Sequence, residues 1–229
     1  MAAMAPQSPS AAQLSATVLG YCVVLGSTTR SVPQILRILR NKSADGLSLA
    51  AQYSELIAYS ITLAYNLRHR YPFSTYGDTA ACWLQDIILV LLIAKYRKQL
   101  GPKVIGSGVL IGLGSWALCS GAVSMQMLAA LQASTILIIT FGGRLPQIIL
   151  NARRGNSGEL SPLTSTMNLA GCLARCFTTA VLTKDSINLA GTLVQMVLNG
   201  ILVWQVMRTA MQDTSSRPSS SAGLEEKAA

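Results

Sequence analysis

A Pro-Gln pair occurs twice in this chain, at Pro33-Gln34 and Pro146-Gln147, each time near the end of a long apolar stretch. The two copies are 113 residues apart, and six of the sixteen positions from 33 to 48 carry the same residue at this offset. Average composition would give about one such match. The chain therefore contains an internal duplication, and its two halves are expected to fold alike.

The composition predicts an integral membrane protein. The chain is 51% hydrophobic and 12% charged, and its apolar runs approach the roughly 20 residues that a helix needs to cross hydrocarbon. Seven spans are predicted, at about 14–38, 49–67, 76–96, 104–120, 124–151, 162–183 and 187–208. The fourth has no counterpart at the 113 offset. The predicted fold is therefore all-α, with two triple-helix bundles joined by a linker helix, in a three-one-three arrangement.

Five regions follow from this arrangement. The bundles occupy 14–96 and 124–208, and the linker helix region is 97–123. The flanking segments, 1–13 and 209–229, have few large apolar residues and are predicted to be disordered.

Loop charges predict the orientation. Ten Lys and Arg residues fall on one side of the predicted spans and three on the other. The positive-inside rule places the larger group in the cytosol, together with the C-terminus, and the N-terminus in a lumen or outside. The net charge of +9 thus reflects membrane orientation, and nucleic-acid binding is not expected.

The sequence favours no catalytic, metal or cofactor site. Its single His lies in a predicted loop, and the five Cys residues fall inside spans without the spacing of metal ligands. No nucleotide-binding Gly-rich loop or Ser-His-Asp set is present, so the protein is not expected to be an enzyme.

The two prolines predict a pair of kinks at equivalent depth. Pro33 removes the hydrogen bond to the carbonyl of Thr29, and Pro146 the one to Gly142. Gln34 and Gln147 can supply the missing hydrogen bonds. These kinks are either static or hinges for alternating access between the two sides of the membrane. The repetition favours hinges.

Five ionisable residues lie within the predicted spans: Arg30, Glu55, Asp86, Arg144 and Arg175. Charged groups at this depth cost roughly 2.5–3.5 kcal/mol on insertion scales, so they are expected to face a cavity or one another. For the two arginines nearest the kinks, a structural role is favoured, either reaching toward the membrane surface or satisfying freed carbonyls.

Polar residues repeat on one helix face in each half. Glu55, Tyr59, Thr62 and Asn66 follow helical spacing, and the offset maps them onto Asn168, Cys172, Arg175 and Thr179. Asp86 maps onto Asn199 in the same way, and Cys82 onto Gln195. A pseudo-symmetric substrate pocket is predicted from Glu55, Tyr59, Asp86, Asn168, Arg175, Gln195 and Asn199, with Arg175 paired to one of the acids. The alternative is a polar zipper that only holds the bundle together.

Several motifs carry a family resemblance from about Leu19 to Trp204. They are the Pro-Gln pairs, the run from Lys42 to Leu49, Ser54-Glu55-Leu56, Tyr71-Pro72-Phe73-Ser74 with Gly77, and Leu173-Ala174-Arg175. With these motifs the chain resembles the PQ-loop membrane proteins, relatives of the SWEET sugar carriers. Within that group it is most similar to the mannose-P-dolichol utilization defect proteins.

The resemblance implies a protein of the endoplasmic reticulum membrane that is required for using dolichyl-phosphate mannose and dolichyl-phosphate glucose in lumenal glycosylation. Membrane lipids, dolichyl-phosphate sugars and glycosyltransferases of that membrane are the expected partners, with Arg175 as the phosphate contact. Two alternatives remain: a proton-coupled exporter of amino acids or other small solutes from an acidic organelle, with Asp86 taking up the proton, and a non-transporting helper of glycosyltransferases.

Overall fold

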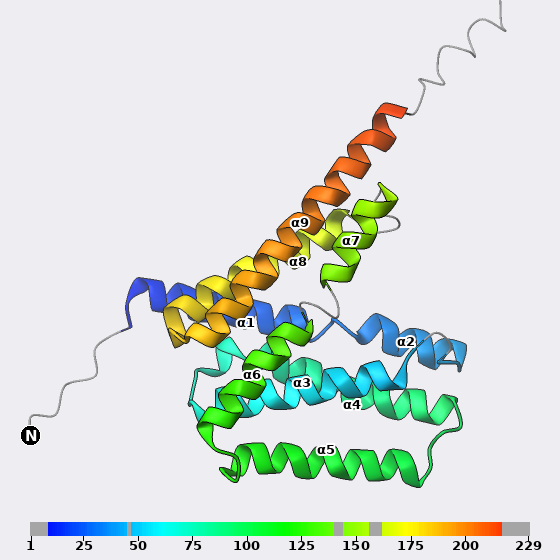
Figure 1. Cartoon of the computed structure of the whole chain (residues 1–229), viewed down its shortest axis with the longest axis vertical. Coiled ribbons are helices and arrows are strands. Elements are labelled where there is room, and N and C mark those ends of the chain that lie inside the picture. The colour runs from blue at the N-terminus through cyan, green and yellow to red at the C-terminus, as the bar shows by residue number, and fades with distance from the viewer. Residues whose placement is uncertain (1–8, 45–46, 140–143, 156–161, 217–229) are drawn as a thin grey trace, which may run out of the picture.

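The computed structural model describes residues 9–44, 47–139, 144–155 and 162–216, and within these ranges the regular secondary structure is helical. The elements in order are α1 (Ala11–Ser27), α2 (Val32–Asn41), α3 (Leu49–Arg68), the 3-10 turn η1 (Phe73–Thr75), α4 (Gly77–Tyr96), α5 (Pro102–Ser120), α6 (Met125–Ile139), α7 (Leu145–Arg154), α8 (Pro162–Thr178), the π-helical turn η3 (Thr179–Thr183) and α9 (Ser186–Ser216). The seven predicted spans correspond to α1 with α2, α3, α4, α5, α6 with α7, α8 with η3, and α9, which confirms the predicted fold class (Figure 1).

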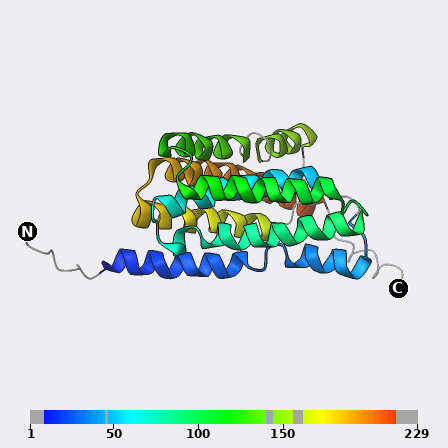
Figure 2. The ribbon, with the colours of Figure 1, turned by 90° about the horizontal axis from the view of Figure 1, so that it is seen from below.

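The first predicted span is two helices rather than one kinked helix. Pro33 lies in the first turn of α2, where its missing N–H costs nothing. A continuous helix would bring the Pro33 ring against the carbonyl of Thr29, so α1 ends at Ser27. Figure 2 shows α1 and α2 end to end along one edge of the molecule.

Side-chain hydroxyls form hydrogen bonds with backbone carbonyls in the last turn of α1. Ser27, Thr28 and Thr29 donate their side-chain hydroxyls to the carbonyls of Val24, Leu25 and Gly26, at 2.6, 2.7 and 2.9 Å. Backbone carbonyls exposed to hydrocarbon need such partners. These carbonyls also accept from the backbone N–H groups of Thr28 and Thr29, so the hydroxyls reinforce the last turn of α1 and do not replace the role that the sequence suggested for Gln34 at the Thr29 carbonyl.

The second half repeats this pattern. Pro146 again lies in the first turn of a short helix, α7. Residues 140–143, including Gly142 with its predicted free carbonyl, lie outside the described ranges.

The two halves pack through equivalent pairs of helices. α1 packs against α8, and α3 against α6. The 113 offset places these two pairs at equivalent positions in the repeat, since α1 corresponds to α6 and α3 to α8. In the second pair, the fully buried Leu128 of α6 packs in a cluster with Ile61, Ala64 and Tyr65 of α3. The interface thus follows the internal duplication.

The surface of the helices is apolar, as expected in lipid. α5 has no buried residue, and its Trp116 is 68% exposed. By length and composition alone, four helical segments of the described chain are able to cross a membrane: Ala11–Asn41, Gly77–Tyr96, Pro102–Ser120 and Ser186–Met211. In the other three predicted spans, a polar stripe lowers the mean hydropathy or a break shortens the helix.

Close packing of α1 depends on Gly20. A Cβ atom at this position would lie 2.5 Å from the carbonyl oxygen of Ser74 in η1, whereas a Cβ at Gly26 of the same helix would have no neighbour within 4 Å. We therefore expect Gly20→Ala to lower stability by about 1–3 kcal/mol through overpacking. Gly26→Ala should leave stability unchanged or raise it by up to about 1 kcal/mol, because alanine favours helix. Thermal unfolding of the purified protein in detergent measures both. An equal effect of the two changes would contradict the tight α1–η1 contact.

Candidate functional site

A charged cluster lies beside the break in the first half. Arg30, from the segment between α1 and α2, donates to the Tyr59 hydroxyl of α3 at 2.6 Å and contacts the Cys82 sulfur of α4 at 3.5 Å. Its guanidinium also lies 3.9 Å from the Glu55 carboxylate, which accepts from Tyr59 at 3.5 Å. The break therefore places a cation against the predicted polar stripe of α3.

Asp86 lies one helical turn beyond Cys82 on α4. Asp86 is 3% exposed, and its Oδ2 atom has no hydrogen-bond partner. A buried carboxylate without a partner is costly in a low-dielectric interior, and such groups in membrane helices commonly mark a solute or proton pathway. We name Arg30, Glu55, Tyr59, Cys82 and Asp86 the Arg30 cluster.

Gln85 bridges the broken backbone beside this cluster. Its Oε1 accepts from the N–H of Ser31 at 2.8 Å, and its Nε2 donates to the carbonyl of Ser27 at 2.9 Å. One buried side chain of α4 thus joins the end of α1 to the start of α2. The equivalent residue of the second half is Leu198, which has no hydrogen-bonding side chain.

The equivalent positions of the second half form a smaller, uncharged arrangement. Asn199, which is buried, donates to the Cys172 sulfur at 3.3 Å and to the carbonyl of Gln195 at 2.8 Å. Asn168 is exposed. The structure therefore brings Asn199 and Cys172 together as the repeat predicted, with Gln195 contributing its backbone, and it places Arg144 near Cys172.

Arg175 pairs with a carboxylate other than those predicted. It forms an ion pair with Asp78 of α4 at 2.5 Å and donates to the carbonyl of Thr75. The predicted pairing with Glu55 or Asp86 is therefore wrong. Periodicity identifies the helix face that carries Arg175, but not which neighbouring helix supplies its partner. Asp78 lies in the first turn of α4, where the helix dipole also favours an acid.

The remaining polar residues of α3 connect the halves. Thr62 donates to Gln132 of α6 at 3.1 Å, Gln132 to Asn188 of α9 at 3.1 Å, and Asn188 to Asn66 at 3.3 Å. This closed set of side chains is the polar zipper that the sequence offered as the alternative. A role in holding the helix bundle together therefore accounts for Thr62 and Asn66.

Asp185 lies at the end of this network, in the loop before α9. It accepts from the backbone N–H of Asn188 and from the hydroxyls of Tyr65 and Tyr71, the latter two at 2.7 and 2.8 Å. Burial opposes ionisation, but these hydrogen bonds outweigh it and lower the pKa of Asp185. Burial and the same carboxylate raise the pKa of Tyr71 to about 12. Asp185 is thus an anion that joins the loop after α3 to the second half.

Three residues of this arrangement were missed or given another role. Arg30 was expected to reach toward the membrane surface or to satisfy freed carbonyls, whereas it contacts Tyr59 and Glu55. Gln85 and Asp78 were not predicted as site residues. The signal for Arg30 was its place directly beside the break, within reach of the polar face of the next helix.

Comparison with known proteins agrees with this fold. Residues 15–75 and 130–188 match the PQ loop repeat. These segments cover half of the chain, so the protein belongs to the PQ-loop family and is a multi-pass membrane protein.

Two relatives extend the comparison. The human protein solute carrier family 66 member 3 is 27% identical over 198 residues, which are 84% of this chain and 90% of that protein. The structure of a eukaryotic SWEET transporter matches 87% of this chain and 97% of its own with a TM-score of 0.71, at 15% identity. The second match supports the three-one-three fold.

The Gln85 bridge generates a stability prediction. Replacing Gln85 by Leu, the residue that the second half carries, leaves the Ser31 N–H without its partner, whereas the Ser27 carbonyl still accepts from the backbone N–H of Arg30. An unsatisfied buried group costs about 1–3 kcal/mol. We expect Gln85→Leu to lower the thermal unfolding temperature in detergent, and Gln52→Leu to lower it less, because the Oε1 atom of Gln52 has no partner to lose. Equal stability of Gln85→Leu and wild type would show that the bridge contributes nothing.

Proposed function

We propose that the protein is a carrier that handles the headgroup of a lipid-linked sugar phosphate, for use in lumenal glycosylation. The observation that carries this proposal is the Arg30 cluster. It combines a guanidinium with a tyrosine hydroxyl and the Glu55 carboxylate beside a break in the first span.

The chemistry of the cluster suits such a headgroup. Guanidinium groups form strong, directional hydrogen bonds with phosphate oxygens, so Arg30 takes the role that the sequence gave to Arg175. Carboxylates accept hydrogen bonds from sugar hydroxyls, and the Glu55 carboxylate lies accessible beside Arg30. A sugar phosphate would therefore contact both the guanidinium and this carboxylate.

The resemblance to the mannose-P-dolichol utilization defect proteins supports the finer assignment. It gives dolichyl-phosphate mannose and dolichyl-phosphate glucose as the donor lipids and the endoplasmic reticulum as the membrane, with glycosyltransferases as functional partners. On the charge count, the N-terminus is lumenal and the C-terminus cytosolic. In this role the protein moves or presents a substrate and performs no catalysis itself.

A second candidate is a proton-coupled exporter of amino acids. The buried and unpartnered carboxylate of Asp86 favours it, because such a group can take up a proton on one side of a membrane and release it on the other. Arg30 and Glu55 together would then contact the carboxylate and the ammonium group of the solute. The third candidate, a non-transporting helper, would leave the Arg30 cluster without a ligand.

Rescue of cells that lack the protein tests the proposal. We expect the knockout to make dolichyl-phosphate mannose normally but to accumulate truncated lipid-linked oligosaccharides. Wild type should restore their size, whereas Arg30→Gln should restore it poorly at equal protein abundance, since it loses charge-assisted hydrogen bonds worth about 1.5–3 kcal/mol. Arg70→Gln, in an exposed loop, is the matched control and should rescue fully. Full rescue by Arg30→Gln would remove Arg30 from the mechanism.

The same cells separate the two transport candidates. Asp86→Asn still hydrogen-bonds but cannot take up a proton, so it should restore glycan size at least in part if the substrate is a sugar headgroup. Full-length glycans in the knockout, with amino acids accumulating in an acidic organelle and no export by Asp86→Asn, would favour the exporter.

A further inference from the structure

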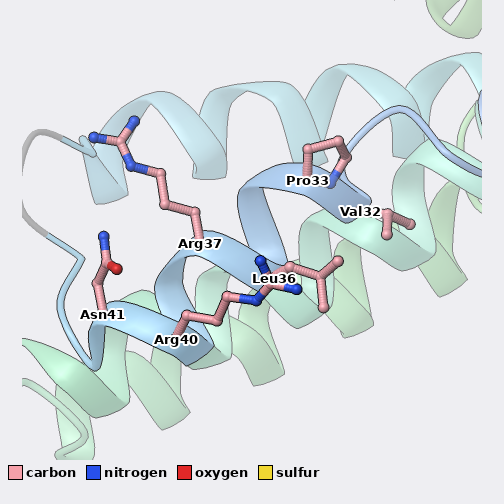
Figure 3. Close-up of a pocket in the computed structure, with 6 residues that line it drawn as sticks. All are labelled: Val32, Pro33, Leu36, Arg37, Arg40 and Asn41. Atoms are coloured by element: carbon pink, nitrogen blue, oxygen red, sulfur yellow. The ribbon is translucent and has the colours of Figure 1, made fainter.

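The outer face of α2 carries a groove that the Arg30 cluster does not use. It has a volume of about 430 Å³ and is lined by Val32, Pro33, Leu36, Arg37, Arg40 and Asn41. These positions recur at helical spacing and form a single stripe. Figure 3 shows them along α2, with Val32 and Pro33 at its beginning and Arg40 and Asn41 at its end. We call this stripe the α2 groove.

The opposite face of α2 holds the helix in the fold. Ile38 is buried against Leu89 and Ile93 of α4, with Ile35 packed beside it. The α2 groove therefore lies on the side of α2 that points away from this packing, and its residues are exposed.

The groove combines charge and apolar surface without a partner for either. In the described ranges Arg37 and Arg40 form no ion pair, whereas Arg30 and Arg175 do. Val32 and Leu36 are both exposed next to them. Apolar residues at the start of the stripe and two guanidiniums at its end match a molecule with a hydrocarbon part and an anionic part.

The second half presents the same pattern on α7. The 113 offset maps the α2 groove onto Leu145, Pro146, Ile149, Leu150, Arg153 and Arg154. Ile149 and Leu150 are exposed there, and so are both arginines. If the two faces packed on each other, four guanidiniums would be brought together, which is unfavourable without an intervening anion.

We propose that the α2 groove binds the phosphate of an anionic membrane lipid. Arg37 and Arg40 contact the phosphate, and the hydrocarbon chain of the lipid lies along Val32 and Leu36. α2 forms the end of a membrane span, so its arginines lie where lipid phosphates are found. This inference rests on the membrane embedding of the chain and is independent of the solute proposed for the Arg30 cluster.

Lipid titration tests the proposal. The full-length protein is placed in nanodiscs of phosphatidylcholine with increasing phosphatidic acid, and lipid retention is measured by native mass spectrometry after release. We expect a preference for phosphatidic acid in the wild type. The double variant Arg37→Gln/Arg40→Gln should lose about twenty-five-fold in affinity, from about fivefold for each cation removed. Arg97→Gln/Lys98→Gln, which removes two exposed charges from the loop after α4, should lose less than threefold.

Two further measurements identify the ligand. Leu36→Ser should weaken retention of phosphatidic acid, and inorganic phosphate should not displace the lipid at millimolar concentration, because it lacks the hydrocarbon chain. The proposal is overturned if both double variants lose affinity equally, if inorganic phosphate displaces the lipid, or if wild type shows no preference for the anionic lipid. Efficient cross-linking of cysteines introduced at positions 36 and 149 in phosphatidylcholine alone would also overturn it, since α7 would then occupy the groove.

Discussion

The break in the first span, between α1 and α2, imposes two requirements on the structure. A proline cannot continue a helix, yet a membrane interior does not tolerate free backbone groups. At the break, Gln85 of α4 binds the backbone on both sides, since it accepts from the N–H of Ser31 and donates to the carbonyl of Ser27. The same break releases Arg30 from the helix axis, so that its guanidinium reaches Tyr59 and Glu55 on α3.

Duplication explains the architecture but not the distribution of charge. The two halves contact through equivalent pairs, α1 with α8 and α3 with α6. Within this symmetric frame the polar residues have separate roles. The Arg30 cluster lies in the first half, whereas the network of Thr62, Gln132 and Asn188 connects the halves.

The sequence predicted those features of the fold that depend on the helical period, the internal repeat and the composition. The spans follow from apolar runs, the equivalence of the halves from the 113 offset, and the polar face of α3 from its spacing. Side-chain partners on other helices could not be predicted, because they depend on helix rotation and depth in the bundle. Arg175 thus pairs with Asp78 rather than with Glu55 or Asp86. Gln85 was missed because a glutamine in a span gives no sign of the backbone it will contact.

We propose that the Arg30 cluster binds the anionic headgroup of a lipid-linked sugar. Equilibrium binding of dolichyl-phosphate mannose to the purified protein in nanodiscs tests this, with dolichol as the competitor that lacks the headgroup. We expect binding that dolichol does not displace and that Arg30→Gln weakens at least tenfold, in line with the loss of one charge-assisted hydrogen bond. Equal affinity of wild type and Arg30→Gln, or full displacement by dolichol, would contradict it.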